Sequence, residues 1–282
     1  MDESFFERPI LNSPYAYPAR HWELNTERQP TNRVVEARRR CDLITPVPLP
    51  QRRRRAPSQA EVGLGGDGGL STPEQQYDVP RAINEIRGYV DNWRRLPNPS
   101  QWQVTPETAR LPQHWRYHQF NDIKPFFCQT EAVETAIWLA EVAHHTVAGE
   151  RIWTYLRRAN RDANPELLRI ALKLATGAGK TTVMAMLIAW QTVNAVGHPD
   201  SKRFSRAFLV ITPGITIKDR LQVLLPNDPN SYCRERELVP PDMLGDIERA
   251  KIVIANYHAF RRREEMEVSK TGRACSRGAA RS

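Results

Sequence analysis

The chain has 282 residues, 40% of them hydrophobic, which is enough for one or two domains with a sizeable core, and its formal net charge is +9. This charge and the pI of about 9.6 favour a polyanionic partner, although a solvated basic surface explains them equally well. The four cysteines form no CxxC pair and no stretch has the apolar length of a membrane helix, so we expect a cytoplasmic protein without a disulfide framework, a zinc site or a membrane span.

Residues 1–75 do not have the pattern of a compact domain. Prolines recur along them, and a run of arginines at Arg52–Arg55 and a glycine-rich stretch at Gly63–Gly69 follow. Proline fixes φ and removes a hydrogen-bond donor, and glycine loses much entropy on ordering, so we expect an extended, largely disordered N-terminal arm. The first 22 residues contain more aromatic side chains than a linker usually has. The alternative is an arm that docks on another surface through side chains such as Tyr15 and Tyr17.

Helical patterns begin near Asp78, and residues 76–125 form the predicted helical N-terminal region. Apolar residues at helical spacing predict an amphipathic helix over 78–95. Thr105 followed by Pro106 is typical of an N-cap and first helical position, so a second helix is expected from there to about Tyr117. A third is predicted over about 130–146.

From Leu168 onward the pattern changes to alternating strands and helices. Short apolar runs predict three strands, at 169–175, 207–212 and 251–255. Between them we expect helical segments over 181–196, 217–225 and 240–250. This alternation predicts an α/β domain over 126–270 with a parallel sheet covered by helices on both faces.

The segment between the first of these strands and its helix has the pattern of a phosphate-binding loop. Gly177 and Gly179 let the backbone approach phosphate oxygens, Lys180 brings a positive charge to the β- and γ-phosphates, and the Thr181 hydroxyl is the predicted Mg²⁺ ligand. The helix N-terminus adds its dipole. The predicted ATP-binding residues of this loop are Thr176, Gly177, Ala178, Gly179, Lys180, Thr181 and Thr182.

Leu174 stands where the general pattern has its first glycine, and the resulting Leu174–Thr181 sequence (LATGAGKT) resembles motif I of superfamily 2 helicases. It is most similar to the motor subunits of type III restriction enzymes. Three further segments resemble motifs of that family in the same order, and the opening Phe6–Tyr15 (FERPILNSPY) resembles the start of restriction endonuclease-like helicases. The three segments are Phe126–Trp138 (FFCQTEAVETAIW), Leu209–Pro213 (LVITP) and Ile252–Phe260 (IVIANYHAF).

The resemblance implies an incomplete RecA-like P-loop domain that binds ATP and Mg²⁺ and moves along duplex DNA, which it contacts mainly through the backbone. It implies that Gln129 reads the adenine edge and that Thr212 and Pro213 lie beside the nucleic-acid backbone. It also implies a second motor domain and a methyltransferase or specificity subunit as partners. The alternatives are a polar helix-start residue for Gln129 and an ordinary strand-ending turn for Thr212 and Pro213.

The acids that such motors need for hydrolysis are not found in this sequence. Neither apolar run after Lys180 is followed by Asp-Glu-x-His, and residues 271–282 have no core pattern. We therefore expect a chain cut off before its acidic motif, with an unstructured tail, in which Lys180 is the one predicted catalytic residue. Two rival functions remain: a non-motor P-loop ATPase or kinase, and a basic DNA-binding fragment without enzymatic activity.

Overall fold

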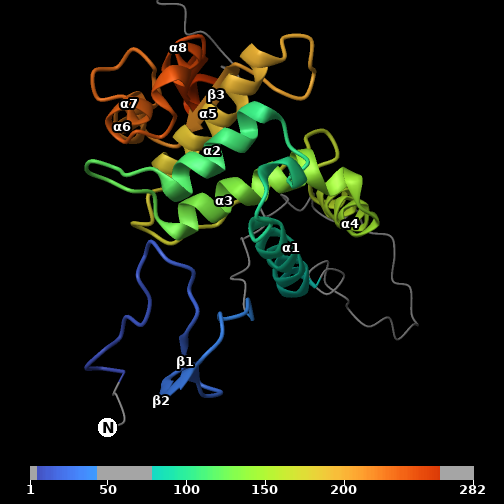
Figure 1. Ribbon diagram of the computed structural model, residues 1–282, viewed down its shortest axis with the longest axis vertical. Coiled ribbons are helices and arrows are strands. Elements are labelled where there is room, and N and C mark those ends of the chain that lie inside the picture. The colour runs from blue at the N-terminus through green and yellow to red at the C-terminus, as the bar shows by residue number, and fades with distance from the viewer. Residues whose placement is uncertain (1–4, 43–77, 261–282) are drawn as a thin grey trace, which may run out of the picture.

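The computed structural model describes residues 5–42 and 78–260. It is a mixed α/β structure with a small antiparallel sheet near the N-terminus, a helical middle and a small parallel sheet in the C-terminal part (Figure 1). The arginine run, the glycine-rich stretch and the predicted tail over 271–282 lie outside the described residues.

The N-terminal part contains a β-hairpin that the sequence pattern did not predict. Strand β1 (His21–Leu24) pairs antiparallel with β2 (Pro30–Val35). The hairpin closes through the side chain of Asn25, which accepts a hydrogen bond from the Gln29 N–H at 2.8 Å. Trp22 of β1 is buried, and its indole N–H donates to the Arg8 carbonyl at 3.2 Å. These strands lack alternating apolar residues, the signal on which strand prediction depends, so the pairing within 21–35 is an ordered feature that the expected arm did not include.

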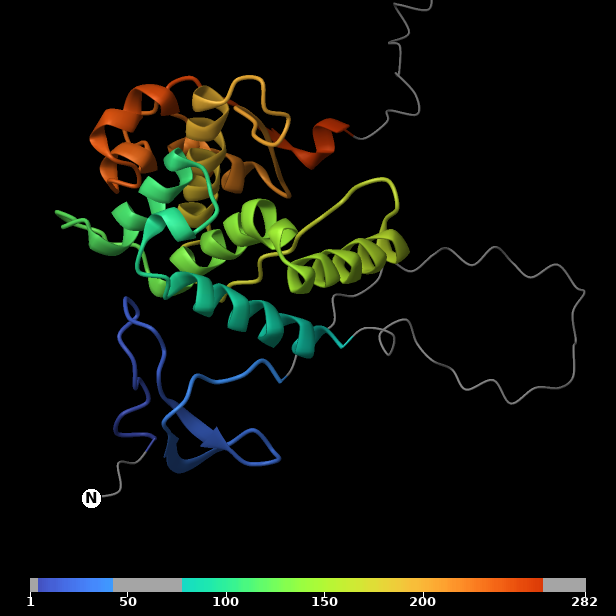
Figure 2. The ribbon, with the colours of Figure 1, turned by 45° about the vertical axis from the view of Figure 1, so that its right-hand side comes forward.

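The described arm docks on the helical body, as the alternative interpretation predicted. The Phe127 N–H donates to the Pro14 carbonyl at 2.8 Å, and the Tyr17 hydroxyl donates to Asp91 at 2.9 Å. Arg38 donates two hydrogen bonds to the Glu131 carboxylate, at 2.5 and 2.7 Å. In Figure 2 the arm, in blue, lies below α1 (Val79–Arg94) and α3 (Phe127–Ile137).

The first two predicted helices are confirmed, and so is the predicted start signal of the second. Helix α1 is capped by the Asp78 side chain, and α2 (Pro106–Tyr117) is capped by Thr105, which accepts from the Thr108 N–H. The third helix, α3, begins three residues before its predicted start. It passes into a π-helical turn at Trp138–Val142 and a 3-10 turn at Ala143–His145.

Helix α4 (Val147–Ala163) was not predicted, although Thr146 caps it through a bond from the Gly149 N–H at 3.0 Å. A 3-10 turn at Pro99–Gln101 links α1 to α2. The four helices surround a core rich in tryptophan. Several buried indole N–H groups have backbone acceptors: those of Trp93, Trp102 and Trp115 donate to the carbonyls of Trp102, Leu96 and Leu238 at 2.7–3.0 Å.

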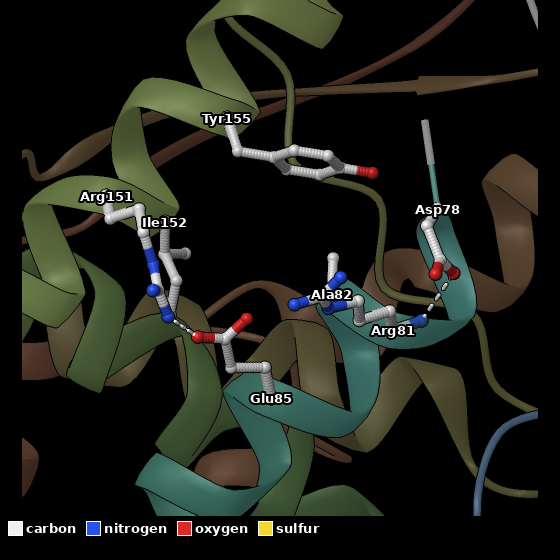
Figure 3. A pocket seen from close by; sticks show the side chains of 7 residues that line it. All are labelled: Asp78, Arg81, Ala82, Glu85, Arg151, Ile152 and Tyr155. Carbon is white, nitrogen blue, oxygen red and sulfur yellow. Dashed lines mark hydrogen bonds and ion pairs between the residues drawn. The ribbon is translucent and has the colours of Figure 1, made fainter. Parts of the chain in front are cut away.

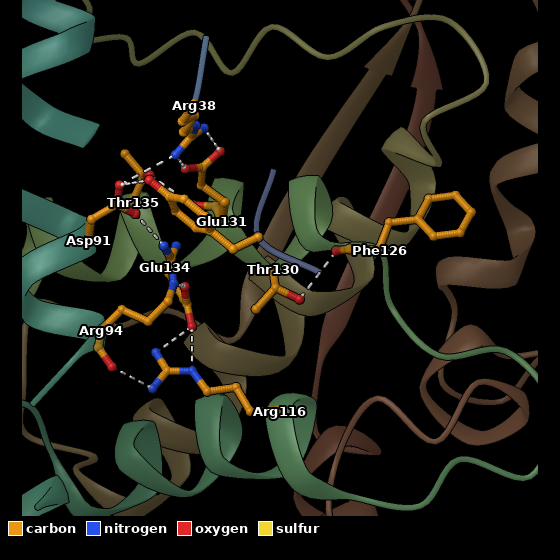
Figure 4. Close-up of polar contacts among 10 residues, drawn as sticks. Arg38, Asp91, Arg94, Arg116, Phe126, Thr130, Glu131, Glu134 and Thr135 are labelled. Carbon is orange, nitrogen blue, oxygen red and sulfur yellow. Dashed lines mark hydrogen bonds and ion pairs between the residues drawn. The ribbon is translucent and has the colours of Figure 1, made fainter. Parts of the chain in front are cut away.

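Three arginines and three carboxylates join the arm, α1, α2 and α3 (Figure 4). Glu134 is fully buried and accepts from Arg94 at 2.6 Å and from Arg116 at 2.8 Å. Arg94 also donates to Asp91 at 2.6 Å, and Arg38 completes the group through Glu131. Opposite charges balance in number, which is the condition under which buried ions are tolerated.

The C-terminal part carries the predicted loop helix and two of the three predicted strands. Strand β3 (Ala207–Thr212) pairs in parallel and in register with β4 (Lys251–Asn256). The helical segments of this part are α5 (Lys180–Gly197), α6 (Ile215–Arg220), α7 (Tyr232–Glu235) and α8 (Leu244–Ile247), with 3-10 turns at Leu221–Leu224, Pro241–Met243 and Tyr257–Phe260.

Two expectations for the sheet are wrong. Residues 169–175 are not a strand, because no described segment supplies the backbone hydrogen bonds that a strand needs. Within the described residues the sheet is also not covered on both faces: Leu209, Ile211 and Val253 are 54–59% exposed on one side. Alternating apolar residues predict strands correctly, but they do not determine whether a neighbouring layer is present.

Candidate phosphate-binding loop

The loop before α5 adopts two left-handed backbone conformations, both at glycine. Gly177 has φ of 81° and Gly179 has φ of 72°, values at which any side chain is strained. The Ala178 N–H donates to the Ala175 carbonyl at 3.3 Å, which closes a turn. Gly179 is also the N-cap of α5, so the chain enters the helix at Lys180. The backbone therefore requires glycine at both positions, 177 and 179, as the loop pattern predicts.

The predicted nucleotide-binding residues of the loop differ in exposure. Thr176, Gly177 and Lys180 are exposed, whereas Ala178, Gly179 and Thr181 are half-buried and Thr182 is buried. Lys180 lies back over its own loop, where its Nζ donates to the Ala175 carbonyl at 2.8 Å. This bond costs little to exchange, since the ammonium group is at the surface and a phosphate oxygen is a stronger, charged acceptor.

Gln129 contacts the loop directly, although 49 residues separate it from Ala178. Its Nε2 donates to the Ala178 carbonyl at 2.9 Å, and its Oε1 accepts from the Phe126 N–H at 2.9 Å. The side chain is 4% exposed. A Cβ at Gly179 would lie 2.2 Å from Nε2 of Gln129. This close approach is a second reason, besides the positive φ, why the position requires glycine. Gln129 thus braces the loop through both polar atoms of its amide.

Arg236 contacts the first turn of α5, and no motif in the sequence predicts this contact. It follows α7, and its Nη1 donates to the Thr182 hydroxyl at 3.0 Å. The guanidinium carbon lies 3.8 Å from the centre of the Tyr232 ring. The two partners are 54 residues apart, and an arginine in a short, charged segment carries no local pattern that marks such a contact.

Helix α5 is fixed at its far end by a buried polar network. Glu141, 1% exposed, accepts from the Trp190 indole and from the Thr108 hydroxyl, both at 2.8 Å. Asn194 donates to the same hydroxyl at 2.8 Å. These bonds tie α5 to α2 and to the π-helical turn after α3. The loop therefore sits on a helix whose position is set by packing and hydrogen bonds on two sides.

Thr212 and Pro213 lie at the carboxyl end of β3. Thr212 is 2% exposed, and its hydroxyl donates to the Gly214 carbonyl at 3.1 Å; Pro213 is exposed. Asn256 is the register partner of Thr212, and its side chain accepts from the His258 N–H at 2.9 Å. Pro213 is therefore available to a ligand at this edge of the sheet, whereas the Thr212 and Asn256 side chains stabilise turns.

Two cavities border the helical region. One, of about 280 Å³, lies between the start of α1 and α4 (Figure 3), and Glu85 and Arg151 form an ion pair across it. The other, of about 520 Å³, lies between α1, α3, α4 and the segment 169–175, and reaches Ala178 of the loop. Its lining is largely apolar, with Arg87, Arg169 and Lys173 among its polar residues.

Cys128 and Cys233 are poor nucleophiles at neutral pH. Burial raises the pKa of the Cys128 thiol above its usual value and raises that of Cys233 to about 12. Within residues 5–42 and 78–260, no three His, Cys, Asp or Glu side chains are grouped as metal ligands. No described helix is long and apolar enough to span a membrane.

No protein-family model, no curated protein and no solved structure matches this chain. A functional proposal for this chain therefore depends on the geometry of the loop and on the motifs in the sequence.

Proposed function

We propose that this chain is the ATP- and DNA-binding part of an ATP-dependent DNA helicase or translocase of superfamily 2, similar to the motor subunits of type III restriction enzymes. One observation carries the proposal. A glycine loop with two left-handed residues leads into the 18-residue helix α5, with Lys180 at its first position and reaching over the loop. The finer fold that we propose is an incomplete RecA-like P-loop domain.

The loop residues have distinct proposed roles in holding Mg·ATP. Backbone N–H groups from Thr176 to Thr182 and the N-terminal end of the α5 dipole attract the phosphates. Lys180 exchanges the Ala175 carbonyl for β- and γ-phosphate oxygens. The half-buried Thr181 hydroxyl binds Mg²⁺. Hydrolysis, the activity proposed for the family, also needs acids that this sequence does not contain.

DNA is the proposed polyanionic partner. The net charge of +9 supports it, and so does the exposed Pro213 at the carboxyl edge of the sheet. Contacts with phosphates depend on salt, so the proposed binding weakens as ionic strength rises. A second motor domain and a methyltransferase or specificity subunit are the proposed protein partners.

The test is nucleotide binding by isothermal titration calorimetry with Lys180→Ala. We expect the wild-type chain to bind Mg·ATP and the variant to lose at least about tenfold in affinity, since a charge-assisted contact contributes about 1.5–3 kcal/mol. Its melting temperature should not change, because Lys180 is exposed. The matched control is Lys202→Ala, an exposed lysine remote from the loop in sequence.

Equal affinity of wild type and Lys180→Ala for ATP contradicts the proposal and favours a basic DNA-binding fragment without a nucleotide site. ATP binding that duplex DNA does not alter favours a non-motor P-loop protein instead. The titration is therefore repeated with and without duplex DNA, at two salt concentrations.

A further inference from the structure

We propose that Arg236 is a second cation of the nucleotide site, and that it binds the α-phosphate of the nucleotide that Lys180 holds by its β- and γ-phosphates. This inference rests on the proposed function and extends it. Arg236 belongs to none of the motifs that the sequence reveals. Its place is decided by the turn after α7, in which the Leu238 N–H donates to the Cys233 carbonyl at 3.1 Å.

The position of Arg236 follows from three contacts around the start of α5. Thr182, the third residue of the helix, accepts from Arg236 at 3.0 Å. A Cβ at Gly179 would lie 3.5 Å from the Thr182 hydroxyl and 2.2 Å from the Gln129 amide. Gln129, Gly179, Thr182 and Arg236 therefore share one side of the loop. Lys180 extends to Ala175, at the start of the loop.

The positive charges around the start of α5 favour a bound anion. A helix N-terminus carries a partial positive charge, so a cation beside it is unfavourable unless a negative group is present. The first turn of α5 contains no acidic residue and contains Lys180. Among residues 5–42 and 78–260, no carboxylate lies within 4.0 Å of the Arg236 guanidinium. The neighbouring Arg234, in contrast, forms an ion pair with Glu248.

The geometry of Arg236 is suited to a phosphate. A guanidinium has five N–H donors in a planar fork, and one of them is used by Thr182. The Tyr232 ring, 3.8 Å away, supports the guanidinium by a cation–π contact and fixes its position. The free donors remain available for phosphate oxygens. Because Thr182 lies beyond Lys180 along the helix, on the side of Gln129, the phosphate nearest the nucleoside is the one within reach.

A different role for Arg236 has to be separated from this one, namely that of a clamp that only holds Thr182. Arg236→Gln removes the charge but keeps a donor for the Thr182 hydroxyl. Thr182→Val removes the hydroxyl and keeps the charge. The matched control is Arg234→Gln, which removes an exposed arginine two residues away. All variants are made in the full chain, and thermal melting reports whether they fold.

The experiment measures the affinity of each variant for ATP, ADP, AMP and adenosine, by competition with a fluorescent ADP analogue. We expect Arg236→Gln to weaken ATP, ADP and AMP alike, by about 10- to 100-fold, and to leave adenosine unchanged. Lys180→Ala, in contrast, weakens ATP and ADP more than AMP, since AMP has no β-phosphate. Arg234→Gln should stay within about threefold of the wild type, and Thr182→Val should lose clearly less affinity than Arg236→Gln.

Two results overturn the inference while leaving the proposed function intact: Arg236→Gln binding all four ligands as Arg234→Gln does, or Thr182→Val reproducing the whole loss. If Arg236→Gln does not fold, Arg236→Lys takes its place. It keeps the charge without the fork, and we expect an intermediate loss for ATP, ADP and AMP; unchanged affinities overturn the inference. Failure of the proposed function is different, because the wild-type chain then binds no nucleotide or Lys180→Ala has no effect.

Discussion

Replacing Gly179 by alanine tests whether Gln129 braces the loop. Both Gly179 and Gly177 have positive φ, so alanine is strained at either position. They differ in what the new Cβ meets. At Gly177 it meets nothing within 4 Å, whereas at Gly179 it lies 2.2 Å from the Gln129 amide nitrogen. Gly177→Ala is therefore a matched control for backbone strain, and the difference between the two variants reports the Gln129 contact.

The expected magnitudes follow from these geometries. Left-handed strain destabilises both variants by about 1–2 kcal/mol. In Gly179→Ala the Gln129 side chain must also leave the Ala178 carbonyl. A buried polar group without a partner costs about 1–3 kcal/mol. Gly179→Ala should thus lower the free energy of unfolding by about 1–3 kcal/mol more than Gly177→Ala, or about 2–12 °C more in Tm for a chain of this size.

Urea unfolding of the two variants, followed by circular dichroism, measures this difference. Adding Gln129→Ala to each completes a double-mutant cycle. The combination of Gly179→Ala with Gln129→Ala should cost less than the sum of the single changes, because the clash disappears together with the side chain. Additive effects, or equal costs of Gly177→Ala and Gly179→Ala, would refute the close approach of Gln129 to the loop.

Three further predictions concern binding, turnover and the arm. Gln129→Ala should reduce the preference for ATP over GTP more than it reduces affinity for inorganic triphosphate; unchanged selectivity in calorimetry contradicts the adenine role. The chain should release phosphate from ATP at no useful rate, since the arginine finger alone is worth about 10³–10⁵ in rate and the acidic motif is not in this sequence; steady DNA-stimulated release that Lys180→Ala abolishes disproves this. Arg38→Ala should weaken docking of the arm by about 1.5–3 kcal/mol, because a charge-assisted pair with Glu131 is lost. Limited proteolysis should then cut near Tyr17 faster than in the exposed control Arg39→Ala, and equal rates contradict it.

Much of the local structure could be predicted from the sequence. Asp78 and Thr105 cap α1 and α2 as their residue types and positions indicate, and β3 and β4 coincide closely with apolar runs. The loop glycines were also placed correctly. These features depend on residues within a few positions of one another, so hydrogen-bonding groups and steric preferences of a short segment are sufficient to determine them.

The tertiary structure decided which distant side chains meet. Gln129 contacts a loop 49 residues away, and Arg236 contacts a helix 54 residues away. The arm docks through Arg38 on Glu131, and the predicted strand at 169–175 has no partner among the described residues. Each outcome depends on how separate elements pack and on which backbone groups find partners, and that is a property of the assembled chain rather than of any one segment.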